Sequence, residues 1–249
     1  MDSFEAVAPA VAIAPERPRP DLWRQGLALL IGSAVIYAVM IYNGSSYEGD
    51  WAPTEETALD IVSWAAFYLI AGGGWLLLSL RLISRESFAA LNIAPGSLWS
   101  DARAGVSLCF SAIVLSSLAS WVIYSLPGYT ETAAAEDMSA VNHLGLAMVL
   151  ASSFYDWTAA AVFEELLRTF TISRLLKFGD TQGMRIAAVG ITTVLFGAYH
   201  LYYGIYGALS IAVIGLVFGS HYIRHGRILP LILAHGLFNT WTTLYDLYG

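Results

Sequence analysis

Charged residues are scarce in this sequence, and their scarcity argues against an ordinary soluble protein. Asp, Glu, Lys and Arg make up 12% of the 249 residues, about half of the share that is usual in soluble domains. A soluble domain of this length would need more charged side chains on its surface. Hydrophobic residues instead make up 57% of the chain. The composition therefore predicts a protein that lies largely in lipid.

Cysteine and basic residues are also rare, which excludes two further kinds of site. Cys109 is the only cysteine, so the chain can form neither an intrachain disulfide nor a metal site made of cysteines alone. Lys and Arg number 12 against 19 acidic residues, giving a formal net charge of −7, and no segment is basic enough for nucleic acid. We expect the lipid bilayer, and no nucleic acid, among the partners.

Long apolar runs fill most of the chain after residue 23. Most are near the length of about 20 residues that a helix needs to cross the hydrocarbon core, and a helix satisfies its own backbone hydrogen bonds in lipid. We therefore predict an all-α, polytopic bundle of about seven to eight transmembrane helices, forming a single domain over residues 24–249. The proline-rich residues 1–23 are expected to form a disordered cytoplasmic tail. The predicted spans are 25–43, 59–80, 105–126, 144–177, 186–203, 206–223 and 228–248.

Two of the loops between these spans contain no basic residue. Residues 43–58 and 127–143 have no Lys or Arg but several Asp and Glu. Lys and Arg gather on the cytoplasmic side of membrane proteins, and seven crossings from a cytoplasmic N-terminus place every basic residue at or toward that side. We expect a multi-pass protein of the cell's inner (plasma) membrane with this orientation.

Ionisable side chains occur inside three of the spans, where they are costly and are functional candidates by default. A rise of about 1.5 Å per residue, counted from the nearest basic residue, puts these groups at roughly 12–22 Å from the cytoplasmic end. Helices of opposite direction thus bring them to similar depths, so we expect one site. The residues are Glu164, Glu165 and Arg168 in the fourth span, His200 in the fifth, and His235 and Asn239 in the seventh.

This set of side chains is typical of hydrolytic chemistry. A buried carboxylate beside an imidazole can orient and deprotonate a water molecule. A second imidazole and an amide can donate hydrogen bonds to a developing oxyanion. Glu164, His200 and His235 could instead ligate zinc with one position left open, although no His-Glu-x-x-His motif is present. A purely structural ion pair between the glutamates and Arg168, and Asn239 as a contact between helices, are the alternatives.

The order and spacing of these residues resemble the CAAX prenyl protease and bacteriocin-processing (CPBP, Abi) family of intramembrane proteases. The resemblance covers about residues 144–249, which would form a protease-like core. It favours a glutamate mechanism without a metal cofactor over a zinc enzyme, acting on a membrane-associated protein or peptide. The motifs that carry it are Glu164-Glu165 followed by Arg168, then Phe196-x-x-x-His200, then His235-x-x-x-Asn239.

The resemblance also implies a role for each residue. Glu164 would be the general base on the attacking water, with His200 as its partner. His235 and Asn239 would stabilise the oxyanion, while Glu165 and Arg168 would hold the motif helix in place.

Arg168 departs from the family's pattern, in which three residues usually separate the second glutamate from the arginine. Only Leu166 and Leu167 intervene here, so Arg168 is turned by about 100° from the expected place. The departure leaves open a catalytically inactive member acting as an immunity or scaffold protein. A proton-coupled transporter is a further alternative, because carboxylates and histidines also form proton relays, but the repeated halves common in transporters are not evident.

The placement of the basic residues generates a prediction about topology. Reporter domains inserted at Glu48 and Glu136 should be active outside the cytoplasm, whereas one inserted at Arg85 should be active inside it. The measurement is a pair of compartment-specific reporters at each position. The reverse pattern would contradict the proposed orientation and the depths counted from it.

Overall fold

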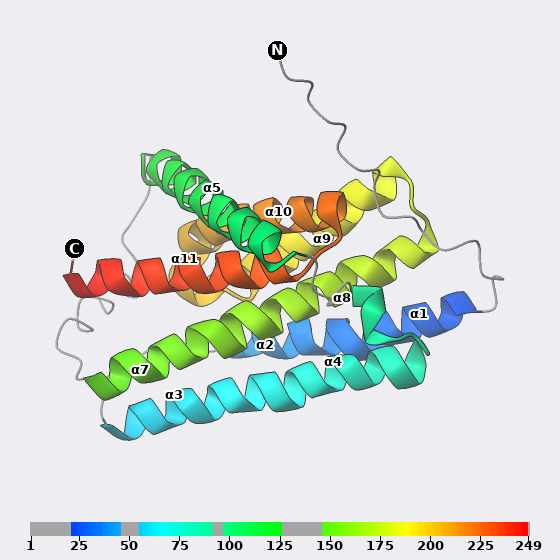
Figure 1. Cartoon of the computed structure of the whole chain (residues 1–249), viewed down its shortest axis with the longest axis horizontal. Coiled ribbons are helices and arrows are strands. Elements are labelled where there is room, and N and C mark those ends of the chain that lie inside the picture. The colour runs from blue at the N-terminus through cyan, green and yellow to red at the C-terminus, as the bar shows by residue number, and fades with distance from the viewer. Residues whose placement is uncertain (1–20, 46–54, 92–96, 126–145, 249) are drawn as a thin grey trace, which may run out of the picture.

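Helices make up all the secondary structure of the described residues, which are 21–45, 55–91, 97–125 and 146–248 of the computed structural model (Figure 1). The all-α prediction is therefore confirmed for this part of the chain. Most of the tail predicted at residues 1–23 lies outside the described residues. The first helix begins at Leu22, two residues before the predicted start of the membrane domain.

Seven helical segments follow the seven predicted spans one for one, and several consist of α- and π-helical parts in sequence. Five of them are long and apolar enough to cross a membrane, while the segment Gln182–Ala198 is shorter. The first three segments are α1 (Leu22–Leu29), η2 (Leu30–Ala34) and α2 (Val35–Ser45); α3 (Glu55–Phe67), η3 (Tyr68–Gly73), α4 (Gly74–Leu78) and η4 (Ser79–Ile83); and α5 (Leu98–Tyr124). The others are α7 (Leu146–Tyr155), η7 (Asp156–Glu164), α8 (Glu165–Leu175) and η8 (Leu176–Phe178); α9 (Gln182–Ala198); α10 (Gly204–His225); and α11 (Leu229–Tyr248), with short turns η5 (Phe88–Leu91) and η9 (Leu201–Tyr203) between segments.

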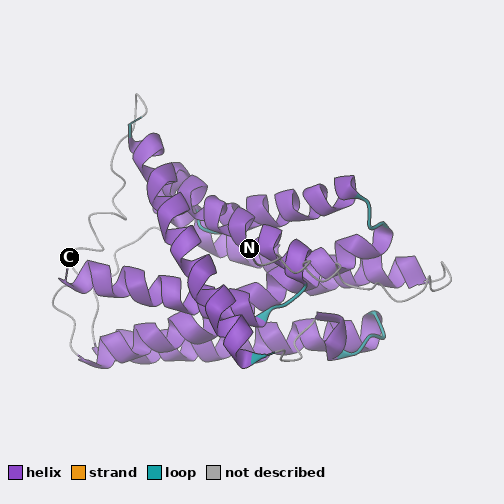
Figure 2. Ribbon diagram, turned by 45° about the horizontal axis from the view of Figure 1, so that its top comes forward, coloured by secondary structure: helices purple, strands orange, loops and turns teal. Residues whose placement is uncertain are grey.

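The segments α1–α2, α3–α4 and α7–α8 run along the long axis of the molecule (Figure 1). The segment α7–α8 contacts both of the others and is therefore central in this layer. On the other side, η7 contacts α11, and α8 contacts α9 and α10. Helix α5 crosses obliquely and packs on α10 and α11 (Figure 2).

Arg174 of α8 links the three segments of this layer at the basic end of the bundle. Its side chain is fully buried, and its Nη1 and Nη2 donate to Gln25 Oε1 and Glu86 Oε2, both at 2.8 Å. Lys177 Nζ lies 3.0 Å from the other oxygen of Glu86. Burial alone would raise the pKa of the Glu86 carboxyl, but its bonds with Arg174 and Lys177 outweigh burial and hold that pKa below its usual range.

A nine-residue π-helix, η7, lies in the middle of the fourth segment and ends at Glu164. π-Helical turns are rare and are frequently found at functional sites. Trp157 Nε1 in η7 donates to Thr240 Oγ1 of α11 at 3.1 Å. The indole lies flat against Gly236, where an added Cβ would be 2.5–2.7 Å from three ring atoms. The absence of a side chain at Gly236 thus permits the close contact between η7 and α11.

We predict that Gly236→Ala destabilises the protein, because Trp157 is anchored by Thr240 and the new methyl group overlaps its ring. Overpacking of this kind costs about 1–3 kcal/mol. Gly190→Ala is the matched control, since no atom lies within 4 Å of a Cβ at that position in α9, and alanine favours the helix by about 1 kcal/mol. The measurement is the midpoint of thermal unfolding in detergent. Equal midpoints for the two variants would contradict the contact.

Candidate active site

Glu164 and Glu165 lie at the junction where the π-helix η7 gives way to the α-helix α8. Both side chains are buried, with residue exposures of 7% and 0%. Buried carboxylates need partners of opposite charge or hydrogen-bond donors. The two glutamates find different surroundings, because successive residues of a helix point in different directions.

His235 of α11 lies between the two carboxylates. Its Nδ1 is 2.8 Å from Glu165 Oε1, and its Nε2 is 3.7 Å from Glu164 Oε2. A carboxylate only accepts hydrogen bonds, so Nδ1 carries the hydrogen and donates to Glu165. In the neutral ring Nε2 then has a free lone pair directed toward Glu164. The carboxylate of Glu165 thereby fixes both the tautomer and the orientation of the imidazole.

Arg168 pairs with Glu165 in spite of its shifted position in the motif. Its Nε lies 3.1 Å from Glu165 Oε2 in a fully buried ion pair. Its Nη1 donates to the carbonyl oxygen of Gly215 at 2.9 Å, and the guanidinium carbon lies 4.1 Å from the centre of the Phe196 ring. Residues three apart lie on the same side of a helix, so the shorter spacing still lets Arg168 reach Glu165.

His200 is not on a transmembrane helix, which corrects the predicted span 186–203. Helix α9 ends at Ala198. Tyr199 N still donates to the carbonyl four residues earlier, that of Leu195, but His200 N donates to the carbonyl only three residues earlier, that of Gly197. Because a carbonyl oxygen only accepts, His200 Nδ1 donates to Phe196 O at 2.8 Å. The structure thus brings His235, rather than His200, next to Glu164. His200 and His235 nevertheless pack against the same ring, with centroids 4.9 and 6.0 Å from that of Phe196.

Asn239 lies one helical turn beyond His235 on the same side of α11. Its neighbour is Asp156, at the start of η7, with which it interacts. Asp156 Oδ2 also accepts a hydrogen bond from Thr243 Oγ1 at 3.1 Å. The amide is therefore on the correct face of α11 but not in direct contact with Glu164.

A cavity of about 100 Å³ opens beside Glu164. The Glu164 carboxylate and the Tyr199 hydroxyl are buried beside this cavity and interact with each other, although Glu164 Oε2 and Tyr199 Oη make no hydrogen bond of standard geometry among the described residues. A polar cavity of this size can hold ordered water that satisfies such atoms. Tyr199 was not predicted as a site residue from the sequence. The only feature that could have indicated it is its position next to His200. The residues that line the cavity are Met40, Tyr68, Tyr155, Ala159, Phe163, Glu164, Tyr199 and Tyr202.

The zinc ligands considered from sequence do not come together as a metal site. Within the described residues, no three His, Cys, Asp or Glu side chains are arranged to hold a metal ion. His235 Nδ1 is directed to Glu165 and His200 Nδ1 to the Phe196 carbonyl. The arrangement fits a pair formed by a carboxylate and an imidazole better than a three-ligand metal centre.

The burial of Arg168 generates a prediction about stability. Arg168→Ala leaves the carboxylate of Glu165 buried without its cation, which costs about 3–5 kcal/mol. We expect a large loss of folded protein, measured as the yield of monodisperse protein in detergent. Arg185→Ala removes an ion pair with Asp180 that is partly exposed, and exposed pairs contribute only about 0–1 kcal/mol. Similar yields for the two variants would mean that the Arg168 pair does not support the fold.

Comparison with known proteins agrees with the motifs of the site. Residues 144–241 match the family model described as type II CAAX prenyl endopeptidase Rce1-like, and all six site residues lie within this match. The chain has no significant match among curated proteins or solved structures. The match therefore supports the resemblance of residues 144–241 to the CAAX protease family that the motifs indicate.

Proposed function

We propose that this protein is an intramembrane endopeptidase that hydrolyses a peptide bond of a membrane-associated protein or peptide through a glutamate-activated water. The observation that carries the proposal is the Glu164 carboxylate, because Glu164 lines a cavity and its Oε2 has the imidazole Nε2 of His235 at 3.7 Å. A general base must reach the proton that it takes either directly or through one water molecule. Glu164 meets this requirement for a water in the cavity.

In the first step, Glu164 takes a proton from the water while the water oxygen attacks the carbonyl carbon of the substrate. The lone pair on His235 Nε2 faces the same region and orients the water or shares its proton. Glu165 and Arg168 act as positioning residues, because they hold the imidazole in this tautomer. His200 has its Nδ1 hydrogen bonded to Phe196 O, so its Nε2 accepts a hydrogen bond from water in the neutral ring.

In the second step, the tetrahedral intermediate collapses and the bond from carbon to nitrogen breaks. Glu164 returns the proton to the leaving amine, so the overall reaction consumes one water and leaves the site unchanged. The negative oxygen of the intermediate needs hydrogen-bond donors that are already in position. The candidates are the Asn239 amide, the Tyr199 hydroxyl and, when it is protonated, His235.

We propose that no metal takes part. The support is that, among the described residues, no three His, Cys, Asp or Glu side chains are arranged to hold a metal ion. The inactive-member alternative rested on the displaced Arg168. Its ion pair with Glu165 removes that reason, so we favour an active enzyme. From the placement of the basic residues, we also propose that it lies in the inner membrane with a cytoplasmic N-terminus.

The proposal predicts that Glu164→Gln, His200→Ala and His235→Ala each abolish cleavage while membrane accumulation stays near normal. Loss of the general base should lower the rate by about 10²–10⁴-fold. Because the groups act as one unit, double variants should be little worse than single ones. Asp60→Asn is the matched control, since this carboxylate is exposed on α3 and lies outside the site.

The measurement is a comparison of membrane proteomes from cells that carry wild type, Glu164→Gln or Asp60→Asn. A precursor that accumulates only in the Glu164→Gln cells would be the substrate. Partial losses that add up between variants would indicate structural roles. Unchanged processing in Glu164→Gln cells, for a substrate that disappears with wild type, would refute the glutamate mechanism.

A further inference from the structure

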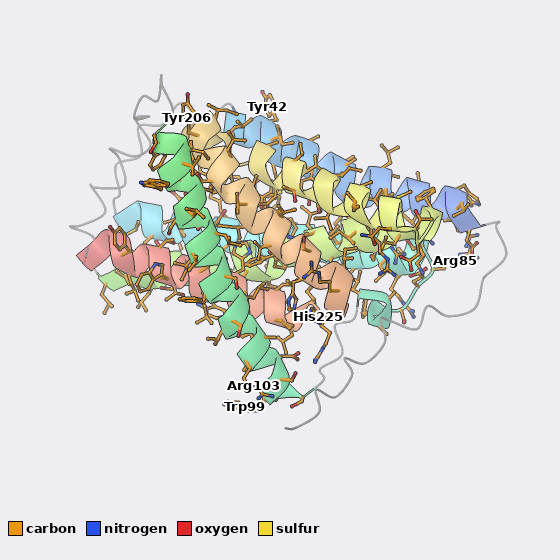
Figure 3. The ribbon with its side chains drawn as sticks, turned by 90° about the horizontal axis from the view of Figure 1, so that it is seen from above. Tyr42, Arg85, Trp99, Arg103, Tyr206 and His225 are labelled. Carbon is orange, nitrogen blue, oxygen red and sulfur yellow. The ribbon has the colours of Figure 1, made fainter. Side chains whose placement is uncertain are left out.

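A second hollow, separate from the active site, lies between α5 and α10 and has a volume of about 280 Å³. None of the six site residues lines it. Its inner wall is apolar and includes Leu108 of α5 and Leu216 and Val217 of α10. We call it the α5–α10 groove. Figure 3 shows that α5 and α10 diverge toward the ends that carry Arg103 and His225.

The rim of the groove is basic. His221, Arg224 and His225 lie on the last turns of α10, at the same end of the bundle as the other basic residues. The two imidazole rings lie in contact, with centroids 4.4 Å apart and planes tilted by 36°. Arg224 is exposed. It has no carboxylate within ion-pair distance among the described side chains, whereas Arg227, three residues later, is paired with Asp101.

Neither of the two helices that form the groove offers this rim a free negative charge. Asp101 is the one acidic residue of α5, and α10 has none. The Asp101 side chain is 2% exposed and is held by Arg227. A buried, paired carboxylate is not available to Arg224 or to the histidines. The rim therefore presents one fixed positive charge and imidazole N–H donors to whatever enters the groove.

We propose that the α5–α10 groove is a binding site for an anionic phospholipid of the cytoplasmic leaflet. Its phosphate would be bound by Arg224, His221 and His225, and an acyl chain would lie along Leu108 and Leu216. The charge complementarity selects an anion, because Arg and imidazole donors at a membrane surface attract acidic headgroups. The apolar wall selects a lipid over a free phosphate, because it continues the lipid-facing surface of two membrane-spanning helices.

The lipid site also adjoins the support of the active site. Leu216 lines the groove, while the preceding carbonyl, that of Gly215, accepts the hydrogen bond from Arg168. An acyl chain in the groove would therefore pack against the same helix, α10, whose Gly215 carbonyl holds Arg168 of the buried ion pair. We expect the bound lipid to stabilise the fold as well as to occupy the surface.

The test is native mass spectrometry of the full chain in detergent, with phosphatidylglycerol or phosphatidylcholine added in equal amounts. Wild type should retain phosphatidylglycerol in preference to phosphatidylcholine. Arg224→Gln should lower phosphatidylglycerol retention by about fivefold, the effect of one basic residue near an acidic headgroup. Arg81→Gln is the matched control, since Arg81 is exposed on η4 at the same end but lies outside the groove.

Four results would overturn the proposal. Equal retention of the two lipids would remove the selectivity for anions. An equal loss in Arg81→Gln and Arg224→Gln would mean attraction by general surface charge. Competition by glycerol 3-phosphate as strong as that of the lipid would indicate a free phosphate site. Ser220→Trp, which fills the groove without changing charge, should also reduce retention, and unchanged retention in that variant would place the lipid elsewhere.

Discussion

A single buried carboxylate, that of Glu165, is the point on which the catalytic half of the molecule depends. It accepts from His235 of α11 and pairs with Arg168 of its own helix, which in turn reaches the backbone of α10 at Gly215. Three helices are thus joined around one fully buried charge. Burial of such a charge is tolerable only with its cation, Arg168, in place. Burying the Glu165 carboxylate costs free energy, but it fixes the tautomer and the orientation of the His235 imidazole next to Glu164.

The two glutamates therefore divide the work, although the sequence places them side by side. Glu165 is paired with the cation Arg168 and accepts a hydrogen bond from the His235 imidazole, so its role is to hold these two side chains in position. Glu164 instead lines a cavity, and among the described side chains no cation lies within ion-pair distance of it except the imidazole of His235, at 3.7 Å, when that ring is protonated. Neighbouring positions on a helix differ by about 100° in direction, and this difference turns two identical side chains into a support and a candidate base.

Much of the fold could be predicted from sequence, because lipid allows few alternatives to a spanning helix. The seven apolar runs correspond to seven helical segments, and four residues of the polar set, Glu164, Glu165, Arg168 and His235, lie together. The pairing within that set could not be predicted. Counting helix rise gives depth but not rotation, so it could not show that His235 rather than His200 lies beside Glu164. It also assumed a continuous helix, whereas α9 ends before His200 and η7 is wound as a π-helix.

The partners of Arg174 bear on which part of this protein can fold independently. The segment that matches the family model, residues 144–241, contains Arg174, but the acceptors of its two terminal guanidinium nitrogens, Gln25 and Glu86, lie outside that segment. A fragment cut at the boundaries of the match would leave a fully buried guanidinium without any carboxylate. We therefore do not expect residues 144–241 to fold on their own. The site residues lie within this segment, but the helices that support it include residues outside the match.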